Sequence, residues 1–421
     1  MTPVSSTRGH SHGTHATSLA EARRQLRDSC PPHERTESVP ITESDGRILA
    51  EPVEAARSVP HYDRAAMDGF AVRAGDIAEA SKQSPVRLEL VEGSIGEMKA
   101  ARVHTGSAFP AGADAVVRVE RADVRENEVT VYDDPPAGKD VAPAGEDVDA
   151  GELLFTVGHR LQPADVALLR ATGHRRVEVV EQPRVSVIPT GEELVQPGTE
   201  PGPGEIIETN GLLVDRFVER WGGKATYGDV VGDDVGALRD AISGDTDHDI
   251  IATTGGTSVG ERDLIDEVVA DIGEVLVHGV AIKPGHPVGV GVVDGTPLVL
   301  LPGYPVSCLV NAVQFLRPAV AWRAGETPDP HPTIRGETTE PLSSKPGKRS
   351  FKRVVVEGWP SNDELERGGD GELNELPAVR SVRKSGASVL SGVTFADGWV
   401  EIPESRDAIP AGEEVSVQRW T

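Results

Sequence analysis

The chain has 421 residues, of which 38% are hydrophobic and 4% aromatic, and its formal net charge is −26. This length predicts about three domains at ~150 residues each. The acidic balance disfavours a nucleic-acid-binding protein, which would need a basic face. No apolar run reaches the ~18 residues of a membrane span, and no secretory signal is visible. We therefore expect a cytoplasmic protein.

The charge also bears on the conditions in which the protein works. Only 9 of the 42 basic residues are lysine, and the carboxylates are spread along the whole chain. Self-repulsion at this charge is largely screened at molar salt, where the Debye length is ~3 Å. An acidic, lysine-poor chain therefore favours a halophilic protein. An anionic ligand would need local positive charge or backbone N–H donors.

The N-terminal part combines helical and β patterns. Residues 1–17 contain the run HSHGTH and are expected to form a disordered tail, with adventitious metal binding a minor alternative. Residues 18–30 have helical spacing, and 160–174 predict a helix that starts near Pro163 and stops at Gly173. Short β runs separated by turn residues fill the part between them.

From residue 183 onward strands and helices alternate, which predicts a three-layer α/β domain with a largely parallel sheet. Pro318 is expected to kink or end a long helix near its C-terminus. After Pro328, short strands and Gly-rich turns predict a small β-barrel. The expected parts are a tail (1–17), a linker domain (18–61 with 147–182), an inserted β domain (62–146), the α/β domain (183–327) and the barrel (328–421).

Two motifs of the α/β domain follow apolar strands. In IIATTGGTSVGERD, Gly255 and Gly256 allow backbone N–H groups to approach an anion, and Asp263 is either a site residue or a helix-dipole partner. IPTGEEL places Thr190 and Glu193 at the C-terminal edge of the sheet, where ligands of such folds bind. A polar turn is the alternative interpretation of IPTGEEL.

Two further motifs contain Pro-Gly turns. In KPGHP, Lys283 and His286 flank the turn, and a lysine is suited to phosphate or oxyanion contact. In LPGYPVS, Pro302 and Pro305 stiffen a turn before a helix, and Ser307 is expected to cap that helix. Ordinary turns and simple capping remain the alternatives. Neither Cys30 nor Cys308 has zinc-site spacing, so both are expected to be buried thiols without a disulfide.

Together with AAMDGFAV, HTGSAFPAGADAVV, GEDVDAG and SGASVLSG, these motifs occur in one order across residues 18–421. The ordered series resembles the molybdopterin molybdenumtransferase family, which includes MoeA and the gephyrin E domain. The resemblance implies four domains in a homodimer, with an α/β domain like the molybdopterin-binding fold. It also implies an active site between the α/β domain of one subunit and the inserted β domain of the other.

The activity implied by the resemblance is insertion of molybdate into adenylylated molybdopterin, with release of AMP and a need for Mg²⁺. A molybdopterin adenylyltransferase would hand over the substrate. The implied catalytic residues are Asp63, Thr105, Asp147, Glu193 and Asp263. Asp63, Asp147 and Glu193 are also the candidate ligands of Mg²⁺ or the oxyanion. The implied cofactor-binding residues are Gly255, Gly256, Ser258, Lys283, His286, Pro302, Pro305 and Ser307.

The sequence departs from the family pattern at three places. His286 stands where a second lysine is usual, Tyr304 stands where asparagine is usual, and VAPA precedes Gly145 where bacterial members carry arginines. His286 could supply a donor, or a charge if its pKa is raised. These changes favour two alternatives, a tungstate-inserting paralogue and a non-catalytic cofactor-binding or scaffold protein. A small α/β adenylyltransferase is a third interpretation, which the additional domains disfavour.

Overall fold

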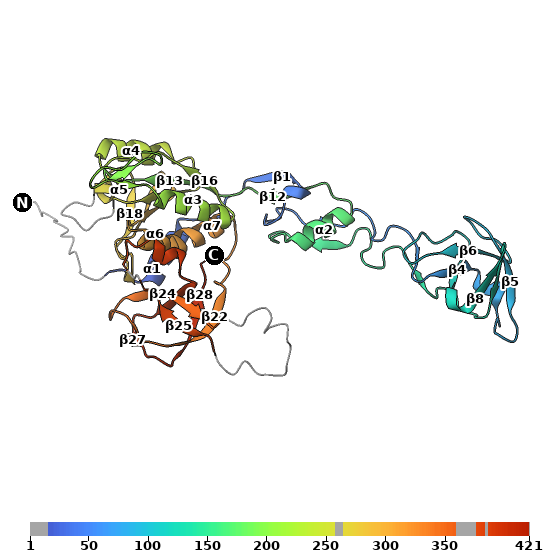
Figure 1. Ribbon diagram of the computed structural model, residues 1–421. Coiled ribbons are helices and arrows are strands. Elements are labelled where there is room, and N and C mark those ends of the chain that lie inside the picture. The colour runs from blue at the N-terminus through green and yellow to red at the C-terminus, as the bar shows by residue number, and fades with distance from the viewer. Residues whose placement is uncertain (1–15, 257–263, 359–375, 384–385, 421) are drawn as a thin grey trace, which may run out of the picture. The chain divides into compact units, whose positions relative to one another are not determined.

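The computed structural model describes residues 16–256, 264–358, 376–383 and 386–420, which form two compact units (Figure 1). One unit comprises residues 36–180, and the other comprises the N-terminal residues up to Arg35 together with 181–421. The expected tail falls almost entirely on residues 1–15, which lie outside the described residues. None of the described helices combines the length and apolar character that a membrane span needs.

The 36–180 unit holds a six-stranded sheet and a smaller α/β part. The sheet order is β7(Ala115–Arg118), β4(Gly69–Val72), β6(Lys99–Val103), β5(Val86–Leu90), β9(Glu128–Val131), β8(Ala122–Arg125). The two-stranded pairs are β3(Arg64–Ala65) with β10(Val141–Ala142), β2(Val53–Glu54) with β11(Leu153–Phe155), and β1(Thr36–Pro40) with β12(Arg176–Val180). Helix α2(Pro163–Ala171) begins with proline at its first position and is followed by Gly173, whose φ is +101°, as the helix-stop pattern predicts.

The other unit is built around a second six-stranded sheet. Its order is β16(Lys224–Tyr227), β13(Arg184–Pro189), β17(Ile250–Thr254), β21(Thr296–Leu301), β20(Gly289–Val293), β18(Glu274–His278). The first four strands are parallel, but β20 and β18 run antiparallel to their neighbours. The sheet is therefore mixed: three of its five strand pairings are parallel, as expected, and β20 alone runs opposite to the other strands. The reason is local: Asp294 and Gly295, both with positive φ, form a tight turn that folds β20 back onto β21.

Helices cover both faces of this sheet, because successive side chains of its central strands point to opposite sides. On one face, Val185 and Val187 pack with α1(Leu19–Asp28), α3(Asn210–Arg220) and the helical segment 305–323. On the other face, Ile188 packs with α4(Val235–Gly244) and α5(Leu264–Ile272). The three-layer α/β architecture is confirmed.

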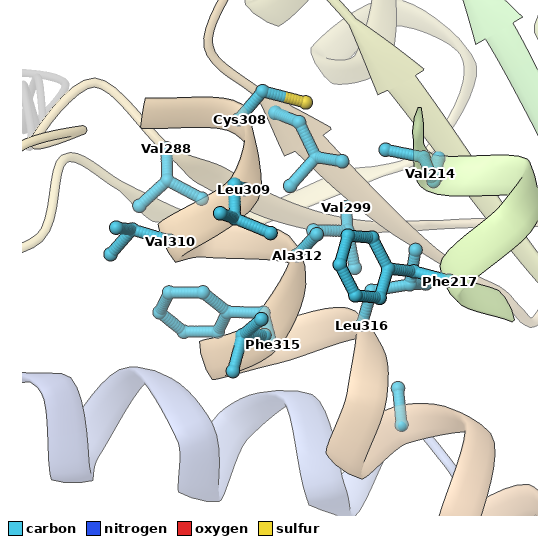
Figure 2. Close-up of a cluster of buried hydrophobic side chains, with 14 of the residues drawn as sticks. Val214, Phe217, Val288, Val299, Cys308, Leu309, Val310, Ala312, Phe315 and Leu316 are labelled. Carbon is cyan, nitrogen blue, oxygen red and sulfur yellow. The ribbon is translucent and has the colours of Figure 1, made fainter. Parts of the chain in front are cut away.

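The first of these clusters forms the largest core (Figure 2). Its centre is one continuous helical rod made of α6(Pro305–Asn311), a π-helical turn (Ala312–Leu316) and α7(Arg317–Arg323). Phe315 and Leu316 are fully buried, and truncating such side chains typically destabilises a protein by about 2–5 kcal/mol. Cys30 and Cys308 are buried free thiols of this cluster.

The C-terminal part is a closed five-stranded barrel. Its order is β24(Arg349–Glu357), β25(Ala378–Ser381), β22(Thr333–Thr338), β28(Glu414–Gln418), β26(Gly398–Ile402), and β26 pairs with β24 to close it. Strand β19(Ile282–Lys283) adds to β24 in parallel. Smaller elements are β14(Leu194–Val195) with β15(Ile206–Ile207), β23(Leu342–Ser343) with β27(Ala408–Ile409), and α9(Ser391–Thr394). The loop that carries Lys283 is thereby held against the barrel.

Candidate functional site

The ends of three neighbouring strands meet at the C-terminal edge of the α/β sheet. Thr190, Gly255 and Gly303 follow β13, β17 and β21. A Cβ on Gly255 would lie 2.1 Å from the carbonyl oxygen of Thr190, and a Cβ on Gly303 would lie 3.6 Å from Cα of Gly255. At Gly255 the backbones of β13 and β17 therefore approach each other where only glycine fits, whereas the contact at Gly303 is of ordinary van der Waals length. Gly256, with φ +68°, continues this edge.

Buried polar groups accompany this edge without protein partners among the described residues. They are Oγ1 of Thr190, Thr253 and Thr254 and Oδ1 of Asn210. The amide Nδ2 of Asn210 donates to the carbonyl of Gly303 at 2.7 Å, which ties α3 to the turn after β21. Because a buried polar group left unpaired costs about 1–3 kcal/mol, these atoms are available to a polar ligand.

Glu193 lies beside the same edge. A Cβ on Gly191 would lie 2.7 Å from Oε2 of Glu193, so its carboxylate folds back over the residue that follows Thr190. The side chain is exposed. A second acid, Glu208, escaped the sequence analysis although it precedes α3 in the run IIETNG. It is 2% exposed and accepts hydrogen bonds from the Gly211 N–H and the Tyr227 hydroxyl.

The loop 283–286 docks on α6 through Asn311. Nδ2 of Asn311 donates to the carbonyl oxygens of Gly285 at 2.9 Å and Ser307 at 2.8 Å. Lys283 remains exposed. His286 is half-buried, and burial lowers its pKa, with repulsion from Lys348 and His278 adding to the effect. His286 is therefore a neutral hydrogen-bonding group at neutral pH and does not replace the charge of a lysine.

The start of α6 differs from the expectation. The helix begins at Pro305 with Tyr304 as its N-cap, and no side chain caps it. Ser307 is buried inside the first turn, so the expected Ser307 cap is wrong: proline at the first helical position starts the helix three residues further upstream. Pro302 is buried, whereas the Tyr304 side chain is 63% exposed.

A turn of the barrel, residues 386–389, covers the start of α6. The N–H of Val306 donates to the carbonyl of Ala387 at 3.0 Å. Arg353, which is 7% exposed, donates to the carbonyls of Gly386 at 3.0 Å and Val389 at 3.3 Å. Among the described residues it has no carboxylate partner. Arg353 was not predicted from the sequence, where its only signal is a cation on the alternating strand FKRVVVE.

Cations thus gather on β19 and β24, in contrast to the acidic chain as a whole. Lys283 pairs in register with Ser350. Burial lowers the pKa of Lys352, and repulsion from Lys283 lowers it further. Lys283 and Lys352 thus form a local positive patch, whereas Arg353, the next residue along β24, points to the opposite side of the strand.

The 36–180 unit carries the other expected site residues at one end. Oδ1 of Asp63 accepts from the Ala144 N–H at 2.8 Å, and the Asp147 N–H donates to the carbonyl of Val59 at 3.0 Å. Thr105 donates from its N–H at 2.7 Å and its hydroxyl at 3.0 Å to Oδ1 of Asp68. These hydrogen bonds lower the pKa of Asp68. The side chains of Asp63, Thr105 and Asp147 are all exposed.

Ser258 and Asp263 lie outside the described residues. Within the described ranges, no group of three or more histidine, cysteine, aspartate or glutamate side chains could hold a metal ion. Asp63 and Asp147 belong to one compact unit and Glu193 to the other. The magnesium site therefore stays a prediction.

Comparisons with known proteins cover nearly the whole chain. Residues 17–173 match the MoeA N-terminal region (domain I and II), residues 186–322 a probable molybdopterin binding domain, and residues 335–420 the MoeA C-terminal region (domain IV). Molybdopterin molybdenumtransferase 2 of Mycobacterium tuberculosis is 34% identical over 90% of this chain and 94% of its own length.

Further relatives agree. Molybdopterin molybdenumtransferase of Haemophilus influenzae is 28% identical over 95% of this chain and 98% of its own length. The crystal structure of a molybdopterin biosynthesis MoeA protein from Pyrococcus horikosii superposes with a TM-score of 0.81 at 33% identity, covering 96% of this chain and 99% of that one. In fold, in motif order and along its length, the chain belongs to the MoeA family of molybdopterin molybdenumtransferases.

Proposed function

We propose that this protein inserts molybdate, or tungstate, into adenylylated molybdopterin and releases AMP. The observation that carries the proposal is the glycine-lined edge of the α/β sheet, together with a cationic patch on the same compact unit. Buried threonine hydroxyls and the side-chain oxygen of Asn210 lie along this edge and have no partner among the described residues. This combination suits a substrate that has a polar pterin and several negative charges.

The roles follow from the chemistry of each group. Gly255 and Gly256 let the backbone contact the pterin, beside Pro302 and Pro305. Lys283, the buried guanidinium of Arg353 and neutral His286 supply donors for the oxyanion and phosphate. An oxygen of water or of the oxyanion attacks the adenylate phosphorus, the anhydride P–O bond breaks, and AMP departs with the new oxygen. No side-chain nucleophile is needed.

Several finer features belong to the same proposal. We expect a homodimer in which Asp63, Thr105 and Asp147 of one subunit act with Glu193, Ser258 and Asp263 of the other. We expect AMP release to need Mg²⁺, but the described residues form no three-ligand cluster, so no step is routed through the ion. The substrate would arrive from a molybdopterin adenylyltransferase.

The test is AMP release from adenylylated molybdopterin by the salt-equilibrated protein, with molybdate and tungstate side by side and with and without Mg²⁺. Lys283→Gln should lower oxyanion-stimulated release about tenfold at subsaturating oxyanion, since a charged hydrogen bond is worth about 1.5–3 kcal/mol. Lys224→Gln, an exposed lysine on β16, is the matched control. Absence of release with both oxyanions would overturn the proposal.

A non-catalytic cofactor-binding or scaffold protein is the second candidate. The departures at His286 and Tyr304 favour it, since a neutral imidazole and an exposed phenol replace a lysine and an asparagine. Stable binding of adenylylated molybdopterin without turnover, in the same assay, would select this alternative.

A further inference from the structure

The C-terminal barrel contains a cavity of about 420 Å³. Its walls come from β24, β25 and α9, and the residues that matter for its chemistry are Val355, Arg380, Val382, Arg383, Ser391 and Phe395. Val355 and Arg380 are direct partners in the β24–β25 ladder. A volume of this size lies within the range of ~300–1,000 Å³ that small-molecule sites occupy.

The cavity joins an apolar floor to an exposed aromatic ring. Val382 is 7% exposed, whereas Phe395 is 74% exposed. The Phe395 N–H donates to the carbonyl of Ser391 at 3.1 Å, so the two side chains lie one helical turn apart on the same face. A phenyl ring exposed to this degree beside a cavity offers a flat surface on which another ring can stack.

Two guanidinium groups stand at the same cavity, and they are not equivalent. Arg380 is already neutralised, because its Nε donates to Oε1 of Glu357 at 2.7 Å. Arg383 is exposed and has no hydrogen-bonded carboxylate among the described residues. One guanidinium therefore remains available for an anionic group, and the Ser391 hydroxyl can add a hydrogen bond.

We propose that this cavity binds a small organic anion that carries a planar aromatic ring, with the ring against Phe395 and the anionic group at Arg383. A nucleoside monophosphate and an aromatic carboxylate share this chemistry. The assignment rests on the barrel cavity alone and goes beyond the proposed oxyanion-inserting reaction. It adds a second ligand site to that of the sheet edge.

Calorimetric titration of the full chain tests the site with AMP, benzoate, adenosine and inorganic phosphate. We expect AMP, benzoate or both to bind, and adenosine and phosphate to bind at least about tenfold more weakly, because each lacks one of the two recognised parts. Binding of AMP alone identifies the nucleotide source, and binding of benzoate alone identifies the carboxylate source.

Single substitutions show whether the ligands bind at the barrel cavity or at the sheet edge. Arg383→Gln and Phe395→Ala change exposed side chains and should each weaken binding about fivefold to tenfold, whereas Arg125→Gln on β8 is the charge-matched control. Lys283→Gln reports on binding at the sheet edge instead. The proposal is overturned if neither aromatic anion binds, if phosphate binds as well as AMP, or if Lys283→Gln weakens binding while Arg383→Gln and Phe395→Ala do not.

Discussion

The buried carboxylate of Asp249 ties together several segments of the chain. It is 2% exposed and precedes β17. Its oxygens accept from Arg35 at 3.1 Å, from the Arg184 N–H at 2.8 Å and from Arg323 at 2.9 Å. Burial raises the pKa of Asp249, but these donors outweigh it and bring the pKa to about 2. Arg35 also pairs with Glu181, so the cluster joins both chain segments that lead to residues 36–180.

We predict that Asp249→Asn destabilises the larger unit by about 3 kcal/mol at pH 7, because it removes one partner of a buried ion-pair cluster. The folded-state pKa is below the ordinary value of 3.8. The stabilisation is therefore complete above about pH 5 and is lost as the pH falls through the interval down to about 2. The difference between the two proteins should shrink over that interval.

Urea unfolding followed by tryptophan fluorescence measures this effect selectively, because all five tryptophans lie in residues 181–421. Asp247→Asn is the control, since its side chain is 80% exposed. A difference between wild type and Asp249→Asn that stays constant from pH 7 to pH 3 would contradict the assigned pKa.

Single residues also mark the limit of sequence-based prediction. The two glycines at 255–256 were predicted from their place after an apolar strand, and the structure puts them at the sheet edge. Arg353 and Glu208 could not be predicted from the sequence, because each is notable only as a buried charged side chain with no oppositely charged partner in the described ranges. Burial depends on contacts such as those with Gly386 and Tyr227, which are distant in sequence.

At the scale of elements, the rod of α6, the π-helical turn and α7 passes through Pro318 without ending. Pro318 has no N–H to donate to the carbonyl of Gln314, four residues earlier. Nε of Arg23, on α1, donates to that carbonyl at 2.7 Å, and its Nη2 donates to the Gln314 side chain at 2.6 Å. A side chain from another helix thus replaces the missing backbone donor.

We predict that Arg23→Met destabilises the larger unit by about 1–3 kcal/mol, because the Gln314 carbonyl is left unpaired inside the protein. Arg24→Met is the matched control: its side chain is 68% exposed and, within the part of the chain that the structure describes, pairs only with Glu21 of the same helix, which is worth about 0.5 kcal/mol. Equal midpoints for the two variants in urea would show that Arg23 does not support the rod.

The close approach between the ends of β13 and β17 leads to a second prediction at the scale of elements. Gly255→Ala should destabilise the larger unit by about 2 kcal/mol more than Gly198→Ala. Both glycines have positive φ, which carries a similar strain in each variant. Only at Gly255 would the new Cβ meet backbone, the Thr190 carbonyl at 2.1 Å, whereas Gly198 has nothing within 4 Å. Similar thermal midpoints for the two variants would refute this close approach.

Most helices and strands were predictable because local periodicity encodes them, as for α1 and α2. Pairing was less predictable. The short turn at Asp294 and Gly295 makes part of the sheet antiparallel, and β19 joins a barrel that begins some fifty residues later. In both cases, the strand that a given strand pairs with depends on contacts between residues far apart in the sequence. Hydrophobic periodicity does not specify those contacts.

At the scale of the whole molecule, the net charge of −26 affects stability through repulsion among many carboxylates and not through any single contact. Exposed ion pairs such as Arg64 with Glu146 contribute about 0–1 kcal/mol each and weaken in salt. The excess of carboxylates repels itself at longer range, and salt screens that repulsion as the Debye length falls from ~10 Å at 0.1 M to ~3 Å at 1 M. The net effect of salt should therefore be stabilising.

We predict that the thermal midpoint rises by roughly 5–10 °C between low-salt buffer and 1 M KCl, equivalent to a few kcal/mol for a chain of this size. Screening acts mostly within the first few hundred millimolar, whereas exclusion of solutes from the surface grows steadily with concentration. Sucrose at equal osmolality controls for the second effect. A midpoint that does not rise with KCl, or that rises equally with sucrose, would mean that carboxylate repulsion does not limit the stability of this chain.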